Sequence, residues 1–277
     1  MSVRLTATFA RAGSEKRPVL IAYLCIGDPS LEGSLAIARA LLDAGADVLE
    51  LGAPFSDPTA DGPTIARAAQ RAIAAGSSMR AAIAIGARLR SEREAPLVLF
   101  GYTNPVIVHG ERETVRAIAE AGIDALLLVD TPPEEGDELR DEARVRGVDV
   151  ISLLSPTSSP SRIEAARKAG SGFVYYVSMT GVTGTTSARD PFDDAASSAV
   201  RLRQSLQLPV VVGFGIDDGD KARRAAGLDR VEGGADGVVV GSAIVRAIES
   251  ANGDVKLACT RAAEVVRTIR AGILARS

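Results

Sequence analysis

Three acidic residues stand close together in one stretch of the chain, LELGAPFSDPTADGPTIARAAQRAI at residues 49–73. Glu50 falls within an apolar segment, Asp57 and Asp61 follow it, and no Lys, Arg or His lies between the first and the last of the three. Carboxyl groups that are clustered or buried bind protons more tightly than isolated, solvated ones. Such groups donate and accept protons near neutral pH, so this stretch is a candidate site for acid–base chemistry.

Each of these carboxylates also has a structural interpretation. Asp61 stands just before Gly62 and Pro63, where it could cap a helix that begins at Pro63. Glu50 could belong to a core ion pair, and Asp57 could face outward from the loop. An unpaired acid inside an apolar strand is costly to bury, however, and this favours a functional role for Glu50.

Glycine-rich segments form a second candidate site. They read SMTGVTG at 178–184, GFGI at 213–216 and GSAIV at 241–245, each after a late apolar run. Glycines let backbone N–H groups approach phosphate oxygens, and a helix that begins at Ser242 would direct its free N–H groups at the anion. None of the three segments contains Lys or Arg, so backbone amides would hold a phosphate there. The alternative is that these glycines only form turns.

Eight short apolar runs indicate how these residues are positioned. They are apolar nearly throughout rather than alternating, as expected of parallel strands that are covered on both faces. We predict strands at 19–25, 47–52, 97–101, 125–129, 149–154, 173–177, 209–213 and 237–240.

Helical patterns lie between these runs, as at 31–44, 112–121 and 134–146, and a short amphipathic helix is expected at the N-terminus. Several helices end in a glycine before the next strand, as in DAGAD at 43–47. Eight such β–α units, without a G-x-G-x-x-G turn, favour an α/β fold in which a closed (β/α)8 barrel carries an extra N-terminal helix. No linker interrupts the pattern, so we expect residues 1–277 to form one domain, with its functional face at the C-terminal ends of the strands.

Composition excludes several classes of protein. The net charge is −3 and aromatic residues make up 4%, which gives neither a basic footprint nor a stacking surface for nucleic acid. No run approaches the ~18–20 apolar residues that span a bilayer, and the N-terminus does not resemble a signal peptide. Cys25 and Cys259 lie in apolar or helical runs, so we expect buried thiols and a cytoplasmic protein.

The scarcity of histidine and the positions of the lysines exclude further reaction mechanisms. His109, the only histidine, is expected in a loop that enters a helix, and alone it supports neither a metal site nor a catalytic triad. The four lysines fall in helical or terminal segments, so a Schiff-base mechanism lacks its nucleophile. We therefore expect carboxylate acid–base chemistry on a phosphorylated substrate, without a metal.

The segment ELGAPFSDPTADGPTI at 50–65 resembles the signature of the tryptophan synthase alpha subunit family. The motifs IGDP, YTNP, LLLVDTPPEE, SMTGVTG, GFGI and VVVGSAIV occur in the family's order over essentially the whole chain. The resemblance implies a (β/α)8 barrel that cleaves indole-3-glycerol phosphate to indole and glyceraldehyde 3-phosphate in tryptophan biosynthesis. It implies no cofactor in this chain and an α2β2 complex with a beta subunit that holds pyridoxal phosphate and receives indole through a tunnel.

The resemblance also assigns roles to residues. Glu50 and Asp61 match the two catalytic carboxylates: Glu50 would protonate indole C3 and then take the 3′-hydroxyl proton, while Asp61 would bind the indole N–H. Asp57 and Pro58 match the loop that faces the beta subunit. The implied substrate contacts are an apolar slot (Tyr23, Phe100, Leu127, Val129), two tyrosines (Tyr102, Tyr175), a loop that closes over the site (Thr183, Gly184) and a phosphate pocket (Gly213, Phe214, Gly215, Gly241, Ser242).

One departure and three alternatives remain. The helical segment expected at 217–236 is about five residues longer than the usual family pattern. Some members of the family work alone as indole-releasing lyases, and the motifs do not separate these from synthase subunits. A catalytically silent partner that only regulates the beta subunit conflicts with the intact Glu50 and Asp61. A barrel isomerase of phosphorylated sugars would use the same phosphate loops but would release no indole.

Overall fold

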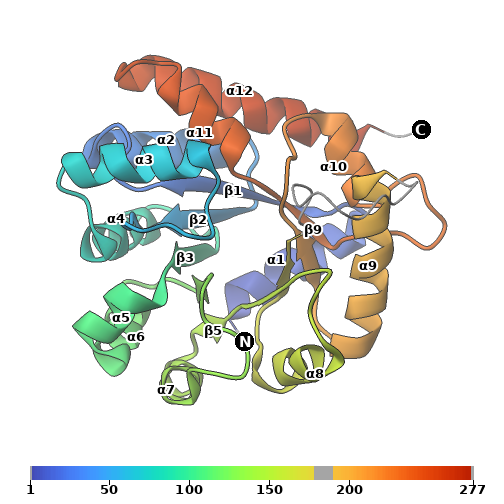
Figure 1. The fold of residues 1–277 in the computed structure, drawn as a ribbon. Coiled ribbons are helices and arrows are strands. Elements are labelled where there is room, and N and C mark those ends of the chain that lie inside the picture. The colour runs from blue at the N-terminus through green and yellow to red at the C-terminus, as the bar shows by residue number, and fades with distance from the viewer. Residues whose placement is uncertain (1, 178–189, 276–277) are drawn as a thin grey trace.

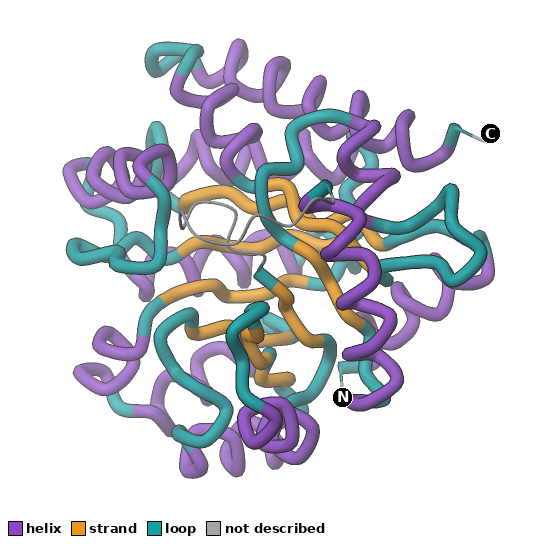
Figure 2. Tube along the Cα trace, turned by 45° about the vertical axis from the view of Figure 1, so that its right-hand side comes forward, coloured by secondary structure: helices purple, strands orange, loops and turns teal. Residues whose placement is uncertain are grey.

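Parallel strands lie at the centre of the molecule and helices surround them (Figure 1, Figure 2). The structure, a computed structural model, describes residues 2–177 and 190–275. The strands are β1 (Val19–Cys25), β2 (Val48–Gly52), β3 (Leu97–Gly101), β4 (Ala125–Leu128), β5 (Asp149–Val150), β6 (Ser152–Leu154), β7 (Val174–Tyr176), β8 (Val210–Val212) and β9 (Gly237–Val240). They form one sheet in the order β5-β4-β3-β2-β1-β9-β8-β7-β6.

The two edges of this sheet are one continuous segment of chain, 149–154. Its first half, β5, pairs with β4, and its second half, β6, pairs with β7. The change of partner occurs around Ile151, whose N–H donates to the carbonyl of Leu126 at 2.9 Å, while the carbonyl of Val150 accepts from Ser171 N–H at 3.1 Å. The eight predicted strands therefore close into a (β/α)8 barrel, and the fifth is assigned as two strands because it joins both neighbours.

The helices follow the strands in the predicted alternation. They are α1 (Val3–Ser14), α2 (Leu31–Asp43), α3 (Pro63–Ala74), α4 (Met79–Arg90), α5 (Thr103–His109), α6 (Glu111–Glu120), α7 (Asp137–Arg146), α8 (Pro160–Ala169), α9 (Pro191–Leu206), α10 (Gly219–Ala225), α11 (Ser242–Glu249) and α12 (Val255–Leu274). The predicted N-terminal helix is α1, and α12 packs along α2, α10 and α11 (Figure 1).

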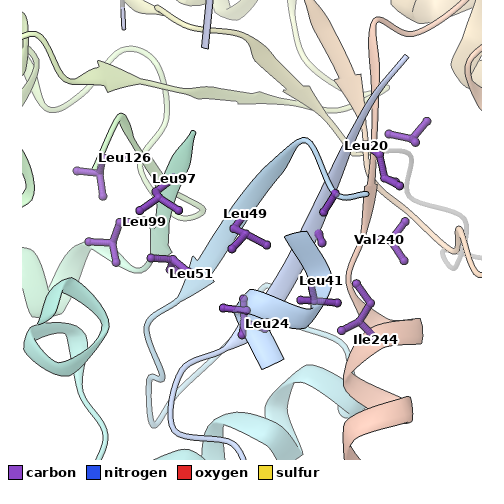
Figure 3. Close-up of a cluster of buried hydrophobic side chains, with 14 of the residues drawn as sticks. Leu20, Leu24, Leu41, Leu49, Leu51, Leu97, Leu99, Leu126, Val240 and Ile244 are labelled. Carbon is purple, nitrogen blue, oxygen red and sulfur yellow. The ribbon is translucent and has the colours of Figure 1, made fainter. Parts of the chain in front are cut away.

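Side chains of each strand alternate between two apolar layers, because successive residues of a strand point to opposite faces of the sheet. Leu49 and Leu51 of β2 belong to the outer layer, where the sheet meets the helices, with Leu41 of α2 nearby (Figure 3). Val48 belongs to the layer inside the barrel. Glu50 has the same parity as Val48, so β2 directs its carboxylate into the barrel.

Aspartates that stand just before strands connect neighbouring elements at the N-terminal end of the barrel through ion pairs and hydrogen bonds. Asp47, before β2, accepts hydrogen bonds from Arg17 at 2.7 and 3.0 Å, from Arg270 at 2.8 Å and from the N–H of Leu20 at 2.9 Å. Asp124, before β4, likewise accepts hydrogen bonds. One comes from Arg90 at 2.7 Å and another from the first N–H of the neighbouring strand β3. This end of the barrel is therefore closed by paired charges.

Two expectations about local structure were wrong. His109 is the exposed last residue of the short helix α5, not part of a loop. The segment 217–236 is helical only to Ala225, where α10 ends. A turn follows because Gly227, at φ +62°, brings its Cα against the backbone of Gly233, and a Cβ there would lie 2.3 Å from the carbonyl oxygen of Gly233.

Both cysteines are free thiols, as predicted, with Cys25 buried and Cys259 only partly so. Within residues 2–177 and 190–275, no helix combines the length and apolar character needed to cross a membrane.

Candidate active site

A cavity of about 530 Å³ opens at the C-terminal ends of the strands. Eleven residues singled out from the sequence line it, and they come from segments far apart in the chain. They are Tyr23, Glu50, Asp61, Phe100, Val129, Tyr175, Gly213, Phe214, Gly215, Gly241 and Ser242. The barrel thus brings the acidic stretch and two of the three glycine-rich segments to one cavity. Thr183 and Gly184, in the third segment, lie outside the described residues.

Glu50 is the most deeply buried acid of the cavity. Its side chain is 0% exposed, and neither carboxylate oxygen has a hydrogen-bond partner within the described part of the chain. Burial raises the pKa of Glu50 to about 8, because a charged carboxylate loses its solvation there. The interpretation of Glu50 as half of a core ion pair is therefore wrong.

Asp61 is partly buried at the end of the loop that precedes α3. The N-cap of α3 is Gly62, and no side chain caps this helix, so the interpretation of Asp61 as the cap is wrong. Burial raises the pKa of Asp61 to about 6, and a hydrogen bond with Tyr102 opposes part of this rise. Its carboxylate is thus free of the helix terminus and lines the cavity.

The third carboxylate, Asp57, is separate from this pair. It is exposed and does not line the cavity, and its Oδ2 accepts a hydrogen bond from the hydroxyl of Ser56 at 2.6 Å. Burial alone accounts for the raised pKa of Glu50, and burial is the one cause that raises the pKa of Asp61. Of the two causes considered for raised proton affinity, clustering and burial, it is therefore burial that acts here, and Asp57 lies outside the cavity.

Tyr102 holds the loop that carries Asp61. It is buried at the end of β3, and its hydroxyl accepts a hydrogen bond from the N–H of Ala60 at 3.1 Å. Its ring stacks on Phe55, with ring centroids 4.9 Å apart. Phe55 and Ala60 lie near the two ends of loop 54–61, so Tyr102 holds both ends of this loop in place. Tyr102 itself does not line the cavity.

Aromatic rings form one wall of the cavity. Tyr23 and Phe100 meet edge to face with ring centroids 5.2 Å apart, a favourable geometry for aromatic pairs. Gly52 makes room for this arrangement, because a Cβ at that position would lie 2.4 Å from the Tyr23 hydroxyl. Val129 also lines the cavity, whereas Leu127 is fully buried in the layer inside the barrel and does not.

The helix that begins at Ser242 is present as predicted. Gly241 is its N-cap, and within the part of the chain that the structure describes no side chain caps its first turn. The first N–H groups of an α-helix have no partner within the helix, so those of α11 are directed at the cavity with a partial positive charge. This arrangement, beside Gly213 and Gly215, fits an anionic group.

The structure adds residues that sequence reasoning missed. Three of them, Leu153, Val177 and Val239, lie in strands already identified, so the two-residue period of the strands could have revealed these. Arg246 could have been found from the four-residue spacing that places it on the same face of α11 as Ser242. The missed residues are Thr59, Ala60, Gly62, Ile65, Leu153, Ser155, Val177, Ile216, Asp217, Val239, Ala243 and Arg246.

Metal ligands are not grouped in the part of the chain that the structure describes. There, no three side chains of His, Cys, Asp or Glu are arranged to hold a metal ion. The arrangement at the cavity consists instead of a buried carboxyl with a raised pKa, a second carboxyl, an aromatic wall and a helix N-terminus. Chemically, it can transfer protons on a substrate that has a flat apolar part and an anionic part.

Comparisons with known proteins agree with this geometry. The family model for the tryptophan synthase alpha chain matches residues 9–273. The tryptophan synthase alpha chain of Geotalea daltonii is 43% identical over 272 residues, which cover 98% of this chain and 99% of that one. The crystal structure of tryptophan synthase subunit alpha from Legionella pneumophila superposes with a TM-score of 0.88 at 32% identity, covering 99% and 98% of the two chains. A chain of Mycobacterium tuberculosis tryptophan synthase, also 32% identical, gives a TM-score of 0.84 over the full length of both. The chain therefore belongs to the tryptophan synthase alpha chain family.

Proposed function

We propose that this protein is a carbon–carbon lyase that cleaves indole-3-glycerol phosphate to indole and glyceraldehyde 3-phosphate. The observation that carries the proposal is Glu50, fully buried at the cavity and without a hydrogen-bond partner in the described residues. A fold gains nothing in stability from a carboxyl in this state, whereas a proton-transfer catalyst needs one whose pKa lies near the working pH.

Retro-aldol cleavage requires two proton transfers. Protonation of indole C3 makes the ring iminium-like, and removal of the 3′-hydroxyl proton then forms the aldehyde. The C–C bond breaks as its electron pair returns to the ring, which leaves as indole. Glu50, with a pKa of about 8, is protonated at neutral pH and can give the first proton; the resulting carboxylate can take the second.

Asp61 has the complementary role. Its pKa of about 6 leaves it mainly ionised at neutral pH, so it can accept a hydrogen bond from the indole N–H and stabilise the positive charge that develops on the ring. Tyr102 positions Asp61 through the contacts described above. In this proposal the two acids differ in protonation because the barrel buries them to different depths, and this difference separates their tasks.

The remaining parts of the cavity fit the two ends of this substrate. We assign the indole ring to the wall formed by Tyr23, Phe100 and Val129, with Tyr175 beside it. We assign the phosphate to the part of the cavity that Gly213, Phe214, Gly215, Gly241 and Ser242 line, next to the start of α11. From the family resemblance, Thr183 and Gly184 would close over the bound substrate.

We further propose that the protein works in the cytoplasm in an α2β2 complex with a tryptophan synthase beta subunit, which would hold the pyridoxal phosphate. The exposed Asp57 and the neighbouring Pro58 form the proposed contact. This loop ends at Asp61. A beta subunit that binds Asp57 could therefore fix the position of the Asp61 carboxylate, and binding of the beta subunit would then raise the rate of turnover.

A spectrophotometric assay of indole release from indole-3-glycerol phosphate tests the proposal. We expect release by the isolated wild-type chain and faster release when the beta subunit is added. Isomerisation of a sugar phosphate without indole would contradict the proposal and favour the isomerase. A rate that no beta subunit changes would replace the synthase subunit with a stand-alone lyase.

A further inference from the structure

We propose that Arg246 provides the counter-charge for the substrate's phosphate and makes this site selective for a dianionic ligand. The inference rests on the proposed function, because the anion in question is the phosphate of that substrate. Arg246 lies one residue beyond the segment GSAIV and outside every glycine-rich motif. It nevertheless lines the same cavity as Gly215 and Ser242.

Helix geometry brings Arg246 to the proposed phosphate position. It follows Ser242 by four residues in α11, so the two side chains lie on the same face, one turn apart. Side chains of a helix lean toward its N-terminus. The guanidinium of Arg246 is therefore directed back toward the uncapped first turn of α11, and its contact with Asp217, in the loop after β8, shows that it reaches this region.

The charges around the cavity create a need for a cation. Among its described lining residues, the ionisable acids are Glu50, Asp61 and Asp217, and the one cationic side chain is Arg246. A phosphate monoester carries about −1.5 to −2 charges at pH 7, and the start of a helix offers only about half a positive charge. Arg246 alone can add a full charge together with a planar fork of N–H donors that matches phosphate oxygens.

Arg246 is also available to an incoming anion. Its Nη2 lies 3.5 Å from Oδ2 of Asp217, the two side chains are 50% and 39% exposed, and no hydrogen bond joins them within the described part of the chain. The other oxygen of Asp217 lies 2.5 Å from Nζ of Lys221. Asp217 therefore keeps Lys221 as a cationic partner when Arg246 turns to a phosphate. The move of Arg246 from Asp217 to the phosphate leaves no carboxylate unpaired.

Calorimetric titration with glycerol 3-phosphate tests this role without relying on catalysis. We expect Arg246→Ala to raise the Kd for this probe about tenfold, the lower end of the effect of a hydrogen bond to a charged group, because the site is half exposed. Arg246→Lys, which keeps the charge, should lose less. The KM for indole-3-glycerol phosphate should rise in parallel while kcat stays within about twofold of wild type.

Arg267→Ala is a matched control. Arg267 lies on α12, is 54% exposed and pairs with Glu264, so its removal changes the net charge equally but away from the cavity. This variant should bind the probe as wild type does. Binding of indole, which has no phosphate, should be equal in all these variants. Added salt should weaken binding of the probe less in Arg246→Ala than in wild type, because one charge–charge attraction is already gone.

Three results would contradict the inference. If Arg246→Ala binds glycerol 3-phosphate as tightly as a wild type that releases indole, the backbone amides suffice and Arg246 has no such role. If Arg246→Lys loses as much affinity as Arg246→Ala, the charge is not what matters. If wild type neither binds the probe nor releases indole, the proposed function fails and this inference fails with it. Should Arg246→Ala not fold, Arg246→Gln gives the same readout, since it keeps polarity without charge.

Discussion

Buried carboxylates occur at both ends of this barrel, in opposite surroundings. At the N-terminal end, Asp47 and Asp124 each accept hydrogen bonds from arginine and from a strand N–H. At the C-terminal end, Glu50 is buried at least as deeply but has no such partner among the described residues, and Asp61 has Tyr102 in place of a cation. Glu50 is buried as deeply as Asp47 and Asp124, so for these three acids the partners decide what each one does.

The two ends of the barrel therefore have different tasks: the acids at one end stabilise the fold, and those at the other end serve the reaction. Charges that are paired at the N-terminal end tie strands to helices, and breaking such a pair leaves a buried charge uncompensated. Carboxyl groups without a cationic partner at the C-terminal end lower stability but keep protons available at the cavity. In barrels of this kind the C-terminal face carries the reaction and the opposite face carries stability, and here the division is visible in the partners of four acidic side chains.

The largest expected effect is the loss of turnover in Glu50→Gln. The amide keeps the size of the side chain but can neither donate an acidic proton nor accept one, so kcat should fall roughly 10³–10⁴-fold, the upper part of the range for general acid–base catalysis. Indole release measures the rate, and thermal unfolding at pH 8 should show a midpoint no lower than that of wild type. A folded variant with near-normal turnover would remove Glu50 from the mechanism.

Asp61→Asn should have a somewhat smaller effect, roughly 10²–10³ in kcat, the size found when one charge-stabilising group is removed. The variant can still donate and accept hydrogen bonds but cannot neutralise a positive charge on the ring. A KM that stays close to the wild-type value would indicate that the loss is confined to the transition state. An unchanged kcat would instead leave Asp61 as a residue that only shapes the loop.

At the opposite end, Asp47→Asn should change stability and leave chemistry intact. Arg17 would lose its buried anionic partner, and removal of one member of a buried pair costs about 3–5 kcal/mol. Urea unfolding should report this loss, while kcat of the folded variant stays within about twofold of wild type. Asp57→Asn, at an exposed position, is the control and should shift stability by no more than about 0.5 kcal/mol. Equal stability of the two variants would break the comparison drawn here.

Per unit of pH, the pH dependence of stability is the smallest of these effects. The folded-state pKa of Glu50, about 8, lies above its ordinary value of 4.5. Between these two pH values the folded protein keeps a proton that the unfolded chain has released, so stability falls as the pH rises through this window. Glu50→Gln should be free of this contribution, which amounts to about 1.4 kcal/mol per pH unit. Parallel stability curves for the two proteins would show that Glu50 is ionised in the fold.

Much of this organisation could be predicted from the sequence because the strands are apolar on both faces and the glycines mark the ends of helices. β1, β3 and β9 have the predicted bounds, and the helix at Ser242 begins at the predicted residue. The division of 149–154 between two partners could not be predicted, because the local pattern of a strand does not reveal which neighbours it joins.

The site was harder to predict than the fold, for physical reasons. Spacing along the chain suggested that three carboxylates interact, but the barrel turns Glu50 inward and leaves Asp57 in solvent. Tyr102 was expected near the substrate, and its contacts with Ala60, Asp61 and Phe55, which hold the loop that carries Asp61, could not be predicted from the sequence. Arg246 belongs to no glycine-rich motif, since it follows the segment GSAIV directly, and only the turn of α11 brings it to the cavity.

Titration of the Glu50 carboxyl itself tests the central claim most directly. Protein labelled with ¹³C at the side-chain carboxyl of glutamate would be followed by NMR from pH 4 to pH 10, and the signal absent from Glu50→Gln would identify the residue. We expect this signal to titrate near pH 8, as a buried carboxyl without a partner requires. A midpoint between pH 4 and pH 5 would show that Glu50 is ionised in the fold at neutral pH, and would contradict the account.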